Sequence, residues 1–209
     1  DLELEKIDKI ITKIESACEP EHIKTVELEL WRKIRHSAST GRRTGLGVTG
    51  VGDAIAMLGF KYGDTRSITF VDELYKTLAC QSYTSSIELA RERGHFDVWN
   101  FERDMTSEFL RRVYDELPQD VQKLWREFGR RNIANTTTAP CGSVSVCAQT
   151  TSGIEPTIFL KYTRKKKIND GDHDVRVDSV DAVGDRWMHF NLVHHGLLRW
   201  MKTTMPQTD

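Results

Sequence analysis

The sequence has 209 residues, with 30 Lys and Arg against 31 Asp and Glu, and a formal net charge of -1. This near balance argues against a general nucleic-acid binder or a basic membrane module, and no run of 18 apolar residues is present that could span a membrane. A hydrophobic content of 38% is low for a freestanding globule, so we expect part of the apolar surface to be shared with something else.

The first two thirds of the chain show helical periodicity. Apolar spacing and glycine or proline boundaries predict helices over residues 2–17, 21–37, 49–58 and 65–93, one around 109–113, and one from Pro118 to Gly129. In the long helix over 65–93 we expect the inward stripe to be formed by Ile68, Val71, Leu74, Leu78, Ile87 and Leu89. Gly94 and Gly129 are typical of helix C-termini.

The texture of the sequence changes at residue 132. Residues 133–138 and 157–165 are predicted to be strands, and residues 181–201 a closing helix. We therefore expect an α/β fold organised as a single partial domain over 1–209, mainly helical over 1–131 and strand-loop-strand over 132–165. Helices are many and strands few, which suggests that some strands of the fold are missing.

The four cysteines indicate a reducing compartment. Cys18, Cys80, Cys141 and Cys147 form no C-x-x-C motif, and no His lies near one at metal-site spacing. We expect free thiols, a cytoplasmic location and no metal site. The helix predicted over 181–201 carries His189, His194 and His195, but adjacent His194 and His195 point to different faces and make a poor metal pair.

A glycine motif at residues 45–50, GLGVTG, fits the G-x-G-x-x-G dinucleotide fingerprint. The fingerprint requires a buried strand before it and an acidic ribose ligand about 20 residues later. Residues 36–44 are too polar for that strand, and Asp64 and Asp72 would lie in a turn and inside a helix. An NAD-binding oxidoreductase is thus the alternative function, and a tight turn with closely packed backbone is the simpler interpretation.

Residues 136–156, TTTAPCGSVSVCAQTTSGIEP, contain hydroxyls and glycines but no Lys, Arg or His. A short strand that ends at Ala139 and leads through Gly142 into a helix suits an anion, because N–H groups at a helix N-terminus carry partial positive charge. Gly142 permits close approach, and the hydroxyls of Ser143 and Ser145 can add donors. The segment can therefore hold a phosphate without a lysine.

These residues carry a resemblance to a known family. TTTAPCGSVS and TSGIEP resemble the substrate-phosphate loop and the following segment in the catalytic chain of ribonucleotide reductases. GRRTGLGVTGVGDAIAMLGFKYG, YTSSIELARERGHFDVW, FGRRNIANTTTAP, YTRKKKIND and VGDRWMHF match in the same order, so the resemblance covers nearly the whole chain. The sequences of the segments GRRTGLGVTG, RRNIA and YTRKKK are most similar to those of the adenosylcobalamin-dependent subgroup.

The resemblance implies a helix-rich C-terminal portion of a ten-stranded α/β barrel. It implies radical reduction of a ribonucleoside di- or triphosphate, with adenosylcobalamin as cofactor and a thioredoxin-like reductant, for deoxyribonucleotide synthesis in DNA replication. The family's radical cysteine lies upstream of the segment that matches Asp1, so no catalytic residue is carried over. The residues that match the phosphate loop are Ala139, Pro140, Cys141, Gly142, Ser143, Val144 and Ser145.

Several residues keep two interpretations. Cys141 replaces the hydroxyl residue usual in the family, and we favour no redox role for it or Cys147. Glu155 is expected to act as a structural hydrogen-bonding group rather than as an acid or base. Arg42 and Arg43 either pair with carboxylates across the barrel or are solvated. The basic run 164–167 is expected to be a solvated face rather than a nucleic-acid site.

The expected partners are a ribonucleotide and the N-terminal portion of the same enzyme, with no membrane and no nucleic acid. We expect the chain alone to be inactive. It is either one subunit of a split enzyme or a piece of a longer one. A non-catalytic remnant that serves as an interaction module is the remaining alternative.

Overall fold

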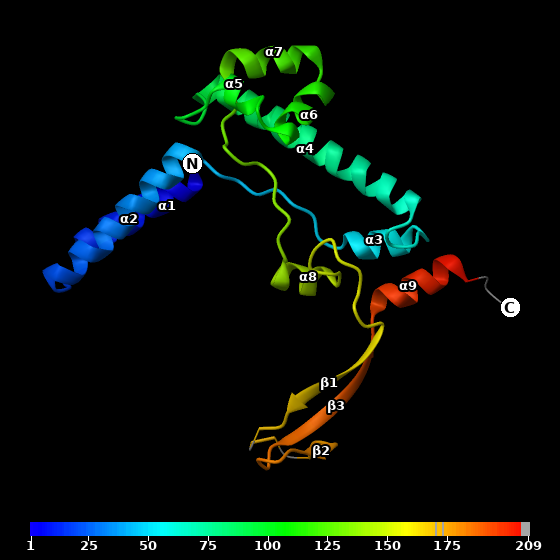
Figure 1. Cartoon of the computed structure of the whole chain (residues 1–209). Helices are drawn as coiled ribbons and strands as arrows, with labels where there is room; N and C mark the ends of the chain where they lie inside the picture. The colour runs from blue at the N-terminus through cyan, green and yellow to red at the C-terminus, as the bar shows by residue number, and fades with distance from the viewer. Residues whose placement is uncertain (170, 173, 206–209) are drawn as a thin grey trace. The chain divides into compact units, whose positions relative to one another are not determined.

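A computed structural model describes residues 1–169, 171–172 and 174–205. The chain divides into two compact units (Figure 1). The first contains Asp1–Gly47 and Asp72–Thr137, and the second contains Val48–Val71 and Thr138–Asp209. The two units are described separately below.

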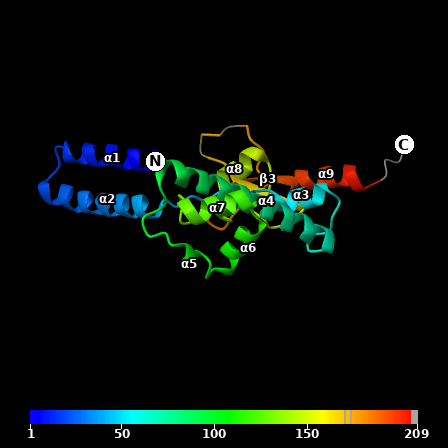
Figure 2. The ribbon, with the colours of Figure 1, turned by 90° about the horizontal axis from the view of Figure 1, so that it is seen from above.

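The first unit begins with a helical hairpin formed by α1 (Leu2–Glu15) and α2 (Glu21–Gly41). The two helices correspond to those predicted over 2–17 and 21–37, and they run side by side (Figure 2). Ile7 of α1 is buried, and ion pairs join Asp8 to Arg35 at 2.6 Å and Glu15 to Arg32 at 3.1 Å. Such exposed pairs each contribute little to stability, so the apolar stripe holds the hairpin.

The core of the first unit forms where the C-terminal part of α4 (Thr65–Arg93) meets α5 (Phe101–Asp104), α6 (Glu108–Glu116) and α7 (Gln119–Phe128). The predicted glycine stops hold, with φ of +79° at Gly94 and +75° at Gly129. The buried cluster consists of Ala79, Tyr83, Ile87, Leu110, Val113, Tyr114, Leu117 and Trp125.

The inward face of α4 differs from the predicted stripe. Ile87 is fully buried as expected, but Ile68 is 61% exposed and Leu89 is 38% exposed. Ala79 and Tyr83 take the inward positions instead, because α7 presents a tryptophan, Trp125, that stacks on Tyr83 with a centroid distance of 5.6 Å. The large Trp125 ring packs on the face of α4 that carries Tyr83 and the small residue Ala79.

The strand predicted at residues 133–138 is wrong as an element. The segment is extended and pairs in parallel with residues 41–47, but only one bridge forms, between Leu46 and Thr136. Backbone bonds from Thr44 N–H to Ala134 O (2.9 Å) and from Thr137 N–H to Leu46 O (3.0 Å) flank it. Two extended segments with irregular pairing are too short for a ladder.

The second unit contains three helices, α3 (Val51–Met57), α8 (Gly142–Ala148) and α9 (His195–Thr204), and an antiparallel sheet. Strands β1 (Lys161–Lys167), β2 (Ser179–Val180) and β3 (Arg186–Val193) are ordered β1-β3-β2, with Lys161 opposite Val193. Helix α3 packs against α9. The strand predicted at 157–165 is present but shifted to 161–167, and its basic run is exposed on β1 as expected.

The predicted closing helix over 181–201 is wrong. Residues 186–193 form β3, and only His195–Thr204 are helical. The reason is a turn at its start: Gly184 has φ +89°, and the Asp181 carboxylate accepts from the amides of Val183 and Asp185 at 3.0 Å each. Asp at the first position and Gly at the fourth position favour a tight turn, so the chain turns here and no helix starts.

Among the described residues, none of the helices combines the length and apolar character that crossing a bilayer requires.

Candidate phosphate-binding loop

The loop matched to the phosphate motif, residues 139–145, leads directly into α8 in the second unit. Cys141 is the N-cap residue and Gly142 is the first helical residue. Ala139, Pro140, Gly142, Ser143 and Val144 are exposed, whereas Cys141 is half-buried and Ser145 is buried. The helix predicted after the loop is therefore present, whereas an extended segment takes the place of the strand predicted before it.

The first three amides of α8 have no protein partner. In the described part of the chain, no acceptor lies within hydrogen-bond distance of the N–H groups of Gly142, Ser143 or Val144. A Cβ atom added at Gly142 would meet nothing within 4 Å. These three residues are exposed, and their amides lie at a helix start, which carries partial positive charge.

The side chain of Ser145 is engaged within the loop itself. Its hydroxyl donates to Gly142 O at 2.9 Å, and its amide donates to Cys141 O at 2.9 Å. In this structure Ser145 fixes the first turn of α8. The hydroxyl of Ser143 has no such bond and remains exposed.

Residues 150–153 form the support beneath the loop. Cys141 N–H donates to Ser152 O at 2.8 Å and Thr150 N–H donates to Ser145 O at 3.0 Å. The same segment is anchored to the start of α3, where Gly50 N–H donates to Thr151 O at 3.1 Å and Val51 N–H to Gly153 O at 3.2 Å. The position of the loop thus follows from main-chain bonds at both of its ends.

Asp53 completes this anchor and was not identified from the sequence. The residue is 7% exposed, and Oδ2 accepts a hydrogen bond from Thr151 N–H at 2.8 Å. The Thr49 hydroxyl donates to Thr151 O at 2.6 Å, so both main-chain groups of Thr151 are bonded. The available signal was a lone carboxylate in the apolar helix VGDAIAM, where an acid is rarely buried without a partner.

Glu155 forms a hydrogen bond within its own segment. The carboxylate accepts from the Ser152 hydroxyl at 2.7 Å. That bond and nearby backbone amides lower the pKa of Glu155 below its usual value, because they favour the charged form. A carboxylate that stays ionised near neutral pH is a poor general acid.

The cysteines and histidines near the site form no ligand cluster among the described residues. All four cysteines are free, and the Cys141 thiol lies 3.5 Å from Ala139 O. His189 lies on β3, 2.8 Å from the Ser179 hydroxyl, and His194 is the N-cap of α9, where its Nδ1 accepts from Gly196 N–H at 3.1 Å. The side chain of His195 lies outside the described residues. The described side chains include no group of three His, Cys, Asp or Glu suited to a metal.

The glycine motif at 45–50 lacks the context of a dinucleotide site. Residues 36–41, which precede it, belong to α2 rather than to a buried strand. A Cβ at Gly47 would lie 2.4 Å from Thr137 O, so this glycine permits close packing of two backbone segments. Nothing in the structure supports the NAD-binding alternative, and the simpler interpretation of a closely packed turn accounts for Gly47.

Arg42 and Arg43 differ in their ion pairing. Arg42 pairs with the Asp1 carboxylate at 2.8 Å, whereas Arg43 is exposed and has no ion pair within the described residues.

Comparison with known proteins gives the family. The family described as "Ribonucleotide reductase, barrel domain" matches residues 21–189. This chain belongs to the ribonucleotide reductase family. The predicted resemblance is therefore confirmed, and so is the predicted fold class, a helix-rich part of an α/β barrel of the ribonucleotide reductase type.

Curated ribonucleotide reductases match across the same region. A vitamin B12-dependent ribonucleoside-diphosphate reductase of Mycobacterium tuberculosis is 30% identical over 132 residues, which cover 63% of this chain and 16% of the relative. A ribonucleoside-diphosphate reductase subunit alpha of Treponema pallidum is 29% identical over 130 residues, 60% of this chain and 15% of the relative. A vitamin B12-dependent ribonucleoside-diphosphate reductase of Thermoplasma acidophilum is 28% identical over 125 residues, which cover 59% of this chain and 14% of the relative. The chain thus matches a small part of a much longer catalytic protein.

Proposed function

We propose that this chain is the part of a ribonucleotide reductase catalytic barrel that holds the phosphates of the ribonucleotide substrate. The observation that carries the proposal is the set of exposed, unpartnered amides at Gly142, Ser143 and Val144. Membership of the family supports it, because these residues match the loop that wraps the substrate phosphates in ribonucleotide reductases.

The chemistry of the loop suits phosphoryl oxygens. Several amides that converge on an anion replace its hydration with fixed donors, and the helix start adds favourable potential. Ala139 and Pro140 shape the approach to Cys141, and the exposed Ser143 supplies a hydroxyl. The Ser145 hydroxyl of the predicted set instead holds the first turn of α8 through Gly142 O. No lysine is needed, because the donors are main-chain groups that remain neutral at every pH.

The rest of the reaction is proposed to reside outside this chain. No residue here matches the family's radical cysteine, so we propose that the chain alone does not reduce nucleotides and acts with an N-terminal portion or subunit of the same enzyme. The family match over 21–189 includes parts of both compact units, which supports treating them as one partial barrel domain. We also propose that a thioredoxin-like protein reduces the complete enzyme and that the enzyme acts in the cytoplasm. The four free thiols are in keeping with a reducing compartment.

Adenosylcobalamin is proposed for the complete enzyme, because relatives named vitamin B12-dependent are among those matched. When bound, it supplies the radical with which the family's chemistry starts. The resemblance assigns no cobalamin contact to a residue of this chain. We therefore assign no residue of this chain to it and derive no step through it.

A pair of substitutions at one position tests the phosphate loop. Gly142→Pro removes one amide donor at the first helical position, where proline is well tolerated and the amide is not needed by the helix. Gly142→Ala keeps the amide and adds only a methyl group to open space. We expect the proline variant to bind a ribonucleoside diphosphate about tenfold more weakly, as the loss of one charge-assisted hydrogen bond predicts, and the alanine variant to bind normally.

Isothermal titration of the full chain, with circular dichroism to verify the fold, provides the readout. Equal affinities of the two variants would refute the role of the Gly142 amide. The inactivity of the chain is tested separately by supplying adenosylcobalamin, a dithiol and a ribonucleotide. Any deoxyribonucleotide formed by the chain alone would overturn that part of the proposal.

A further inference from the structure

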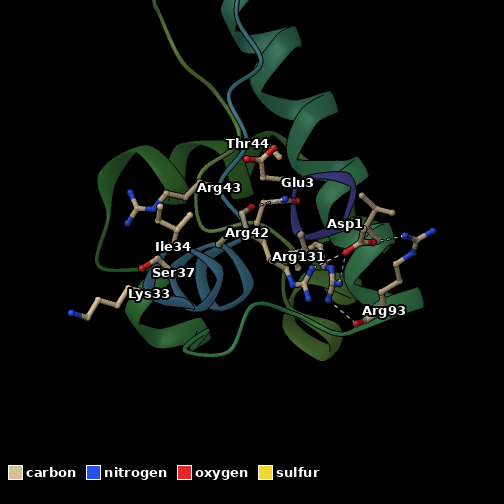
Figure 3. Close-up of a pocket in the computed structure, with 14 residues that line it drawn as sticks. Asp1, Glu3, Lys33, Ile34, Ser37, Arg42, Arg43, Thr44, Arg93 and Arg131 are labelled. Atoms are coloured by element: carbon tan, nitrogen blue, oxygen red, sulfur yellow. Dashed lines mark hydrogen bonds and ion pairs between the residues drawn. The ribbon is translucent and has the colours of Figure 1, made fainter. Parts of the chain in front are cut away.

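A pocket of about 690 Å³ lies within the first unit, between the start of α1, the C-terminal half of α2, the end of α4 and residues 131–132. Three arginines from separate segments reach into it: Arg42, Arg93 and Arg131 (Figure 3). The volume falls within the range of small-molecule sites. None of these residues belongs to the phosphate loop.

The three guanidinium groups converge on a single carboxylate. Asp1 lies 2.8 Å from Arg42 Nη1, 2.7 Å from Arg93 Nη1 and 3.5 Å from Arg131 Nη2. Figure 3 shows the side chains gathered around Asp1. The rest of the lining adds one carboxylate, Glu3, and two further positive groups, Lys33 and Arg43, so positive charge is in excess in the pocket.

The cluster is held in place at a cost. Burial, together with repulsion from Arg42 and Arg93, lowers the pKa of Arg131 from its usual value. Arg131 is nevertheless fixed, because its Nη1 donates to Arg93 O at 2.7 Å and Gly94 O at 2.9 Å. Its Nη2 still faces the pocket. The like charges are therefore kept together by the fold, which makes them a preformed anion receptor.

Apolar side chains also line the pocket, and two of them are partly exposed. Leu4, Ile34, Ala38 and Leu89 line it, and Ile34 and Leu89 are each 38% exposed. Arginines beside an apolar wall suit a molecule with a charged group at one end and an apolar or planar body at the other. Leu89 was predicted to lie in the core but is partly exposed because its side chain lines this pocket.

We propose that this pocket binds a phosphate monoester, with the phosphate between Arg42, Arg93 and Arg131 and the organic group against Ile34 and Leu89. The dianion takes the place that the Asp1 carboxylate occupies here and neutralises the excess positive charge. Guanidinium groups recognise phosphate oxygens through paired hydrogen bonds, and three of them offer more donors than one carboxylate can satisfy. This site is separate from the proposed substrate-phosphate loop and does not depend on it.

Phenyl phosphate is the probe for the full chain, with inorganic phosphate and phenol as its two halves. Residue-resolved amide NMR is the readout, because it distinguishes shifts at residues 42, 93 and 131 from shifts at residues 139–145. We expect phenyl phosphate to move the arginine-pocket resonances and to bind more tightly than inorganic phosphate. Phenol alone is expected to produce no saturable shift there.

Arg93→Gln removes a partly exposed arginine whose close ion pair is with Asp1. We expect a loss of affinity of about fivefold or more, as removal of one charged donor predicts. Arg32→Gln is the matched control, because Arg32 is also exposed, pairs with Glu15 on the same hairpin and does not line this pocket. Asp1→Asn removes the competing carboxylate and is expected to tighten binding.

Three results would overturn the proposal. One is the absence of saturable shifts at residues 42, 93 and 131 with phenyl phosphate. Another is equal affinity of the Arg93→Gln and Arg32→Gln variants. The third is weaker rather than tighter binding by Asp1→Asn, which would make Asp1 part of the receptor instead of its internal competitor.

Discussion

The Asp104 cluster in the first unit and the loop 139–145 in the second treat polar groups in opposite ways. Asp104 is 5% exposed and accepts from Arg130 Nε at 2.9 Å, Arg130 Nη2 at 2.8 Å, Trp99 Nε1 at 3.0 Å and Trp125 Nε1 at 3.2 Å. The loop instead exposes three consecutive amides without an acceptor in the described chain.

The contrast separates structure from function. A buried charge is tolerated only when its partners are supplied by the protein, so Asp104 and Arg130 serve the fold. Arg130 also donates from Nη1 to Asn132 O and Ile133 O at 2.8 Å, which fixes the start of the segment that leads to the loop. Exposed amides cost little in water and remain available to a ligand.

The largest effect is expected from Asp104→Asn. The substitution keeps the shape but leaves the Arg130 guanidinium buried without a counter-charge, so we expect a loss of about 3–5 kcal/mol in the free energy of unfolding. Urea denaturation measures it. Glu116→Gln breaks the exposed pair with Lys76 (2.7 Å) and should cost less than about 1 kcal/mol. Similar costs for the two variants would show that Asp104 is not central to the fold.

Asp53→Ala is expected to have an intermediate effect that reaches the loop. Removing the acceptor of Thr151 N–H should cost about 1–3 kcal/mol. It should also weaken binding of a ribonucleoside diphosphate, because residues 150–153 hold the amide of Cys141. Asp64→Ala is the control, since Asp64 also accepts from a backbone amide, that of Ser67 at 2.8 Å, but does not contact the loop. If both variants bind nucleotide normally, Asp53 does not position the loop.

The smallest effect concerns acid pH and the β2–β3 turn. Hydrogen bonds from Trp187 Nε1 and backbone amides lower the pKa of Asp181 from its usual value. A depressed folded pKa gives stability that is complete above the unfolded pKa and is lost as pH falls through the folded one. We therefore expect the Trp187 indole N–H resonance to shift only as the pH falls below the range in which an unpaired aspartate titrates, about pH 4, because the folded carboxylate takes up its proton there.

Two variants check that assignment. Asp181→Asn should remove the acid-induced shift of the Trp187 resonance, whereas Glu127→Gln, a change to an exposed carboxylate on α7, should leave it intact. An unchanged shift in Asp181→Asn would assign the transition to another group.

The sequence predicted those parts of the fold that local signals determine. The bounds of α4 follow from apolar periodicity closed by Gly94, and the start of α7 follows from Pro118. The same periodicity failed at residues 186–193, because Trp187, Phe190 and Val193 are spaced as in a helix although they lie in β3, which the Asp181–Gly184 turn connects to β2. Pairing with β1 decided that segment, and pairing partners distant in sequence leave no periodic signal.

The candidate site divides in the same way. Gly142 and Ser143 could be identified from composition and resemblance, since glycine and hydroxyl residues at a helix start are themselves the signal. Asp53 could not, because its partner Thr151 is 98 residues away and lies in a different segment. The arginine pocket was also beyond sequence reasoning, as Arg42, Arg93 and Arg131 come from three separate segments.

The most direct test is to follow the backbone amide resonances of Gly142, Ser143 and Val144 while a ribonucleoside diphosphate is added to the full chain. Saturable shifts at these three amides, with slower hydrogen exchange and no change for the nucleoside without phosphate, are the expected result. Unchanged resonances at nucleotide concentrations that saturate binding elsewhere on the chain would contradict the role of the loop.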